Sequence, residues 1–123
     1  MTADQAIDPA HLDPVAAAEA ADPILPEIVR RLVAAVDPER IYLFGSRARG
    51  DARADSDYDL LVVTRPDTGH RREVVRQAYD ALWGLGVPKD IVVVPSDWFE
   101  WMRSAAASLP ATVEREGRLL YAA

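Results

Sequence analysis

Two short apolar runs joined by a polar loop, within residues 41–63, constrain the fold of this chain more than any other feature. The first run extends from Ile41 to Phe44 and stops at a Gly-Ser pair, and the second extends from Tyr58 to about Thr64. Short β-branched and aromatic runs with turn residues between them are typical of neighbouring β-strands. We therefore expect two strands of a sheet here, with the polar loop at one end of the pair.

Two aspartates, Asp57 and Asp59, open the second apolar run. Residues i and i+2 of a strand point to the same face, about 7 Å apart at about 3.3 Å rise per residue. Like charges side by side repel each other unless a cation neutralises them. Carboxylate oxygens are hard ligands that favour Mg²⁺ or Mn²⁺ over softer metals. The pair is therefore a candidate metal site; the alternative is two acids that merely cap a loop.

A third acid, Asp90, opens another apolar run that continues to Val94. Such nearly continuous apolar runs are typical of strands buried on both faces. A third carboxylate is needed if two ions about 3.5–4 Å apart are to flank a transferring phosphoryl group. We predict that Asp90 lies at the end of a sheet strand, next to the other two acids.

The loop after the first strand has the composition of an anion-binding turn. Gly45 permits close approach of the backbone to a ligand, and Ser46 supplies a hydroxyl and a backbone N–H at a predicted helix start. Arg47 and Arg49 could donate charged hydrogen bonds to phosphate oxygens. The loop has G-x-x-x-x-G spacing, but Asp51 stands where a Walker A motif requires lysine, which excludes that motif.

Helices are predicted on both sides of these strands. Apolar residues from Ile24 to Val36 repeat at helical spacing, with Asp22 as N-cap and Pro23 in the first turn. A second helix is predicted over residues 70–85, ended by glycines, with these residues on its apolar face: Val74, Val75, Ala78, Leu82 and Trp83.

A third helix is predicted after Pro95, with Ser96 or Asp97 as its cap and Glu100 completing a capping box. Its aromatic residues leave two interpretations open, core packing or a partner interface, with Phe99 outside the shared face. The residues that share that face are Trp98, Trp101, Met102 and Ala105. A short helix over residues 110–116 and an edge strand over 118–121 complete the expected elements.

Charge and composition exclude several classes of protein. The chain of 123 residues has a net charge of −6 and no cysteine, so disulfides and thiolate metal sites are excluded. Residues 1–29 contain six acids and no Lys or Arg, and the remainder is neutral. No positive block is large enough to follow a nucleic-acid backbone. No apolar run reaches the roughly 18 residues of a membrane span, so we expect a cytoplasmic protein.

We predict two segments: a flexible acidic tail over residues 1–22 and one domain over residues 23–123. Gly45-Ser46, ten further residues, and then Asp57-Tyr58-Asp59 before Leu-Leu-Val resemble the signature of the DNA polymerase β-like nucleotidyltransferase superfamily. The small size is similar to its minimal nucleotidyltransferase (MNT) branch, the antitoxin half of HEPN/MNT toxin–antitoxin pairs. This resemblance implies an α+β fold, with a small mixed β-sheet flanked by helices.

The resemblance also implies roles for individual residues. Asp57 and Asp59 match the metal-binding pair, and Gly45-Ser46 matches the phosphate-contacting turn. Asp90 matches the third acid by its context alone. Arg47 departs from the small or aromatic residue expected after the Gly-Ser pair, which leaves the metal site intact and the shape of the nucleotide pocket open.

From the residues and the resemblance together, we expect a Mg²⁺-dependent nucleotidyltransferase, with two ions, that uses ATP as the donor of AMP. Beyond the acidic tail, roughly a hundred residues remain, enough for a catalytic unit but not for a dedicated acceptor pocket. A protein acceptor fits best, and the resemblance makes it a tyrosine of a cognate HEPN toxin, held in a homo- or hetero-oligomer. Two alternatives stay open: a catalytically silent antitoxin that neutralises by binding, and an aminoglycoside-type small-molecule nucleotidyltransferase.

Overall fold

The computed structural model describes residues 22–123, and the predicted tail lies outside the described residues except for Asp22. Its helices and strands follow one another in the order α2 (Ile24–Val36), β1 (Arg40–Phe44), α3 (Ser46–Arg49), β2 (Tyr58–Thr64), α4 (Arg71–Ala81), β3 (Lys89–Pro95), α5 (Ser96–Met102), α6 (Leu109–Glu116) and β4 (Arg118–Ala122).

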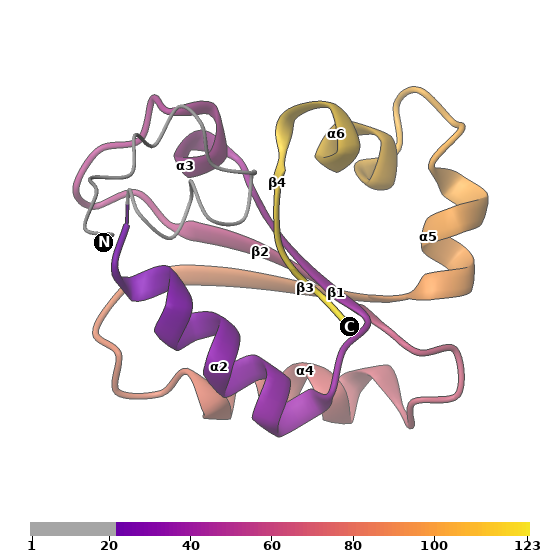
Figure 1. The fold of residues 1–123 in the computed structure, drawn as a ribbon, viewed down its shortest axis with the longest axis horizontal. Helices are drawn as coiled ribbons and strands as arrows, with labels where there is room; N and C mark the ends of the chain where they lie inside the picture. Colours follow the sequence, from indigo (N-terminus) through magenta and orange to yellow (C-terminus); the bar gives the residue numbers. More distant parts are fainter. Residues whose placement is uncertain (1–21) are drawn as a thin grey trace, which may run out of the picture.

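The four strands form one mixed sheet in the order β3-β2-β1-β4. Strand β1 runs antiparallel to both β2 and β4, whereas β2 and β3 are parallel. A parallel pair needs a crossover connection, and α4 supplies it (Figure 1). This arrangement confirms the predicted α+β class with a small mixed sheet flanked by helices.

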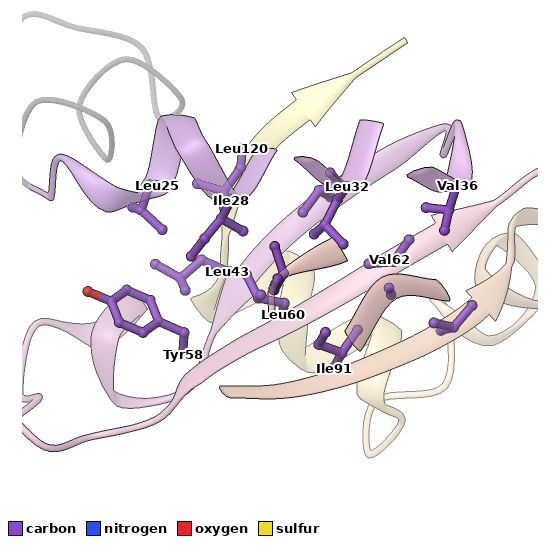
Figure 2. Packing of buried hydrophobic residues seen from close by; sticks show 14 of the residues in the cluster. Leu25, Ile28, Leu32, Val36, Leu43, Tyr58, Leu60, Val62, Ile91 and Leu120 are labelled. Atoms are coloured by element: carbon purple, nitrogen blue, oxygen red, sulfur yellow. The ribbon is translucent and has the colours of Figure 1, made fainter. Parts of the chain in front are cut away.

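Helices cover both faces of the sheet, with α2 and α4 on one side and α5 and α6 on the other (Figure 1). Side chains alternate between the faces of a strand, so β2 contributes to two clusters. The larger one joins Leu25, Ile28 and Leu32 of α2 to Leu60 and Val62 of β2 (Figure 2). The second contains these residues from the opposite face: Tyr42, Leu61, Val63, Val94, Phe99 and Val113.

Helix α2 ends as the sequence predicts but begins one residue later, with Pro23 rather than Asp22 in the N-cap position. The carboxylate of Asp22 accepts a 3.3 Å hydrogen bond from the N–H of Ile24, and its carbonyl accepts one of 3.1 Å from the N–H of Leu25. The helix ends at Asp37, whose φ of 46° is left-handed. Its N–H donates to the carbonyl of Val33, as at helix C-termini where the chain turns away.

Helix α4 is shorter than predicted, and the assignment of Trp83 to its apolar face is wrong. The helix ends at Ala81, and the N–H of Trp83 donates to the carbonyl of Asp80 at 3.2 Å, three residues back. This tighter turn rotates Trp83 off the face that buries Val74 and Leu82. The Trp83 side chain is 81% exposed.

The face predicted for α5 is wrong at Phe99 and Trp101, although Trp98 packs against the second cluster. Phe99 is fully buried and stacks on Tyr42, with ring centroids 5.5 Å apart, whereas Trp101 is 73% exposed. The reason is that α5 starts directly at the end of β3, so the exit of the strand fixes the rotation of the helix. Ser96 and Phe99, three residues apart, then face the sheet, while α5 ends before Ala105.

The capping box predicted for α5 is absent from this helix start. Glu100 instead accepts hydrogen bonds from Arg40 at 2.8 Å and from Arg103 at 2.7 Å. The carboxylate of Asp97 accepts from the adjacent N–H of Trp98. Glu100 is therefore paired with two arginines, one distant in the sequence and one three residues away, instead of capping the helix.

The last helix and strand agree with the sequence. Helix α6 is capped by Ser108, whose hydroxyl accepts from the N–H of Ala111 at 3.2 Å, and it ends at Gly117. Strand β4 then adds to the edge of the sheet beside β1. Within residues 22–123, the structure contains no helix long and apolar enough to cross a membrane.

Candidate active site

The three acids singled out from the sequence lie at one end of the central strands. Asp59 and Asp90 are register partners across the parallel strands β2 and β3. Residues paired in this way present their side chains to the same face of the sheet. Asp57 directly precedes β2 and is exposed, as is Asp90, whereas Asp59 is half-buried. The structure therefore brings Asp59 and Asp90 together, with Asp57 beside them.

The Gly-Ser turn packs against this group. Gly45 has φ 74° and ψ −156°, a conformation that is essentially restricted to glycine. A Cβ atom built on Gly45 would lie 2.1 Å from the Oδ2 atom of Asp59. Gly45 is therefore required twice, once for its backbone conformation and once for the space that the Asp59 carboxylate occupies.

The electrostatics of Asp59 favour a bound cation. Burial raises the pKa of the Asp59 carboxyl, and the negative charges of Asp90 and Asp57 raise it further, with Arg49 opposing them. The ionised form of Asp59 is thus disfavoured by a dry environment and by two neighbouring acids. A divalent cation would relieve both costs, and a set of carboxylates alone suits a hard ion such as Mg²⁺. The donor chemistry fits the predicted metal.

The carboxylates of Asp57, Asp59 and Asp90 lie near one another, but their present positions do not form a complete set of metal ligands. Among residues 22–123, no three acidic or histidine side chains are close enough together to hold an ion as they stand. The strand register nevertheless places two of the predicted ligands side by side. The roles of Asp57, Asp59 and Asp90 as metal ligands stay predictions.

The two arginines of the loop have different environments. The guanidinium of Arg47 donates to the carbonyl of Ser56 through Nε at 3.1 Å and through Nη2 at 2.9 Å, and to that of Ala54 at 3.2 Å. It also lies over the ring of Tyr58, 4.0 Å from the centroid. Arg49 is half-exposed, and its ion pair among residues 22–123 is a 3.5 Å contact with Asp51. Among the described residues, Arg47 is therefore held by several backbone carbonyls, whereas Arg49 is more exposed and less engaged.

Ser46 begins the short helix α3, as predicted, and is half-buried next to Gly45. The N–H groups of Ala48 and Arg49 both donate to the carbonyl of Gly45 at 3.1 Å, which closes the turn. A contact of the Gly-Ser pair with phosphate stays a prediction.

Sequence reasoning missed two residues that support the acids. The hydroxyl of Tyr79, on α4, accepts a 2.9 Å hydrogen bond from the N–H of Ile91 and lies 3.4 Å from Oδ1 of Asp90. The carboxylate of Asp22 accepts a 2.5 Å hydrogen bond from the hydroxyl of Tyr58. Neither contact has a local signature, because the partners are far apart along the chain.

A separate cavity lies away from these acids. It is lined by residues 70–73 at the start of α4, which follows the opposite end of β2 from Asp59. It therefore does not contribute to the carboxylate site.

Comparisons with known proteins agree with this geometry. Residues 24–119 match a protein family described as "Nucleotidyltransferase domain". None of the curated protein sequences matches the chain.

Solved structures similar to this chain include two toxin–antitoxin systems. One, MntA-HpeT, carries two Asp-to-Glu substitutions; it is 24% identical, with a TM-score of 0.59, and the match covers 80% of this chain and 73% of that one. Another, solved with AMP-PNP, is 26% identical, with a TM-score of 0.55, over 79% and 73%. A candidate nucleotidyltransferase from Sulfolobus solfataricus is 22% identical, with a TM-score of 0.57, over 90% and 89%.

Proposed function

The chain belongs to the nucleotidyltransferase domain family, as its Gly-Ser and Asp-x-Asp pattern predicts, and on that premise we propose that it transfers AMP from ATP to a protein hydroxyl. The acceptor that we propose is a tyrosine of a cognate toxin of the HEPN type. The chain would then act as an antitoxin by modifying that toxin. The toxin–antitoxin structure solved with AMP-PNP, an ATP analogue, supports both the donor and the partner.

One observation carries the proposal: Asp59 and Asp90 are paired in register at one end of the sheet. In the reaction, the acceptor oxygen forms a bond to the α-phosphorus of ATP as the bond to the β-phosphate oxygen breaks, and pyrophosphate leaves. Asp90 accepts the proton of the acceptor hydroxyl. Ser46 and Arg49 steady the departing phosphates.

Asp57, Asp59 and Asp90 would together hold Mg²⁺. When bound, Mg²⁺ neutralises phosphate charge and lowers the pKa of the acceptor hydroxyl. The raised pKa of Asp59, caused first by burial and then by Asp90 and Asp57, is the feature of this chain that such an ion would relieve.

A second function has one observation in its favour. The described carboxylates form no finished ligand set, which would suit a silent antitoxin that neutralises its toxin by binding alone. Replacing the pair by asparagine separates these two functions.

The test is mass spectrometry of the partner protein encoded by the neighbouring gene. The chain and its partner are purified together and incubated with Mg²⁺ and, in separate reactions, ATP, GTP, CTP or UTP. We expect the mass of one or more AMP groups on a partner tyrosine with ATP, and no addition with the Asp57→Asn/Asp59→Asn double variant. A partner left unmodified by all four nucleotides would count against the proposal.

A further inference from the structure

A cluster of three side chains lies beneath the two aspartates of the loop, on the other face of the sheet. Tyr58 stands between Asp57 and Asp59 in the sequence, so its side chain points to the opposite face of β2. There it joins the cluster of α2 and is 5% exposed (Figure 2). Tyr58 therefore cannot reach the face on which Asp59 and Asp90 lie.

The hydroxyl of Tyr58 ties β2 to the start of α2. It donates a 2.5 Å hydrogen bond to Oδ2 of Asp22, while Oδ1 of the same carboxylate accepts from the N–H of Ile24. Burial and the neighbouring Asp22 carboxylate raise the pKa of Tyr58 to about 12. The start of helix α2 is thus linked to the residue between the two acids.

Arg47 completes the cluster and holds the segment that leads into the acids. Its guanidinium covers the Tyr58 ring at 4.0 Å and approaches the Asp22 carboxylate at 3.8 Å. Its donors reach the carbonyls of Ala54 and Ser56, just before Asp57. A guanidinium can hold a planar ring and several carbonyls at once because its donors form a rigid, planar fork, which lysine lacks.

We propose that Arg47, Tyr58 and Asp22 are positioning residues that fix the Asp57-x-Asp59 segment for cation binding, and that Arg47 acts in this way rather than as a phosphate ligand. The inference rests on the proposed function for its consequence in catalysis. Its physical content is that the two acids repel each other and need support from the opposite face of the sheet. Arg47 supports the segment before Asp57 by donating to its carbonyls. Tyr58, which stands between the two acids, anchors β2 to the start of α2 through Asp22.

Two variants test the cluster, each with a matched control. Tyr58→Phe removes the hydroxyl but keeps the stacked ring; Tyr42→Phe removes a buried hydroxyl that contacts Arg40, away from the acids. Arg47→Lys keeps the charge but loses the fork. Arg31→Lys makes the same exchange at a guanidinium that donates to the carbonyls of Ala81 and Trp83.

The first measurement is binding of Mn²⁺ alone, by electron paramagnetic resonance, with each unfolding temperature recorded to confirm folding. We expect Tyr58→Phe and Arg47→Lys each to weaken Mn²⁺ binding by about tenfold, as for other supports of metal ligands, and the two controls to leave it unchanged. If Arg47 contacts phosphate instead, Arg47→Lys will weaken binding of ATP and leave Mn²⁺ binding unaltered.

The second measurement separates kcat from the KM for ATP in transfer to the partner protein. The positioning role predicts a lower kcat with a KM within about twofold of wild type. Wild-type affinity for Mn²⁺ in both variants would overturn the inference alone. A wild-type chain that binds no Mn²⁺ would contradict the metal-dependent proposed function, and the inference with it.

Discussion

A Cβ atom at residue 45 would lie only 2.1 Å from the Oδ2 atom of Asp59, so any side chain in place of Gly45 would have to displace the Asp59 carboxylate. Gly45 therefore packs directly against Asp59, so the Gly-Ser turn and the Asp-x-Asp motif are adjacent in space although the polar loop separates them in the sequence. It also provides a sharp test, because Gly50 has a positive φ with open space around it.

Gly45→Ala is expected to abolish transfer and to lower the free energy of unfolding by about 3 kcal/mol, from backbone strain and displacement of Asp59. Gly50→Ala carries left-handed strain alone, so we expect a loss of about 1 kcal/mol with activity retained. Thermal unfolding and the transfer assay measure both. Equal losses in the two variants would refute the proposed contact with Asp59.

Asp59→Asn is expected to stabilise the protein in the absence of metal while removing activity. The folded-state pKa of Asp59 is raised above the ordinary 3.8, so its ionisation costs stability. That cost is absent below pH 3.8, grows as the pH rises from 3.8 towards the folded-state pKa, and is complete above it. We therefore expect equal unfolding temperatures at low pH and an advantage of about 1–3 °C for the variant at neutral pH, without divalent metal.

Added Mg²⁺ provides the control for this prediction. It should raise the unfolding temperature of the wild type at neutral pH and have little effect on Asp59→Asn, because the variant lacks the charge that the ion neutralises. A wild type that is more stable than the variant without metal would contradict the electrostatic interpretation of Asp59.

Tyr79→Phe is expected to destabilise the start of β3. Loss of the hydroxyl leaves the N–H of Ile91 without its acceptor, a cost of about 1 kcal/mol, and removes the neighbour of Asp90. We expect slower transfer and faster amide exchange at Ile91. Tyr121→Phe, on β4, is the matched control, and it should alter neither quantity. Unchanged exchange at Ile91 would argue against the contact.

Phe99→Ala and Trp101→Ala test which side of α5 faces the sheet. Phe99 is fully buried, so its truncation should cost about 3–5 kcal/mol, whereas the exposed Trp101 should change stability by less than about 0.5 kcal/mol. Urea unfolding of the two variants measures this difference. A larger loss at Trp101 would restore the face that the sequence pattern predicts.

The sequence was most informative where local patterns determine structure. The apolar runs around Asp59 and Asp90 predict the strands. The two carboxylates lie at one end of the sheet because β2 and β3 are parallel and each has its acid near its start. The rotation of α5 could not be predicted, because it depends on where β3 ends and on the ring of Tyr42. The contacts of Tyr79 and Asp22 also join residues that are far apart in the sequence, so no sequence spacing predicts them.

The same limit applies to Arg47. From the sequence, an arginine after a Gly-Ser turn indicates a phosphate ligand as readily as a structural residue. Only the fold brings the carbonyls of residues 54 and 56 within reach of its guanidinium. Its engagement by the loop gives a physical reason why an arginine can stand where the resemblance predicts a small or aromatic residue.

We propose that the chain neutralises its partner by chemistry at Asp57 and Asp59. The most direct measurement compares neutralisation of the toxin by the wild type and by Asp57→Asn/Asp59→Asn, with binding of the two proteins measured in parallel. We predict that the double variant still binds its partner but no longer neutralises it. Full neutralisation by the double variant, with no nucleotide transferred, would contradict the claim.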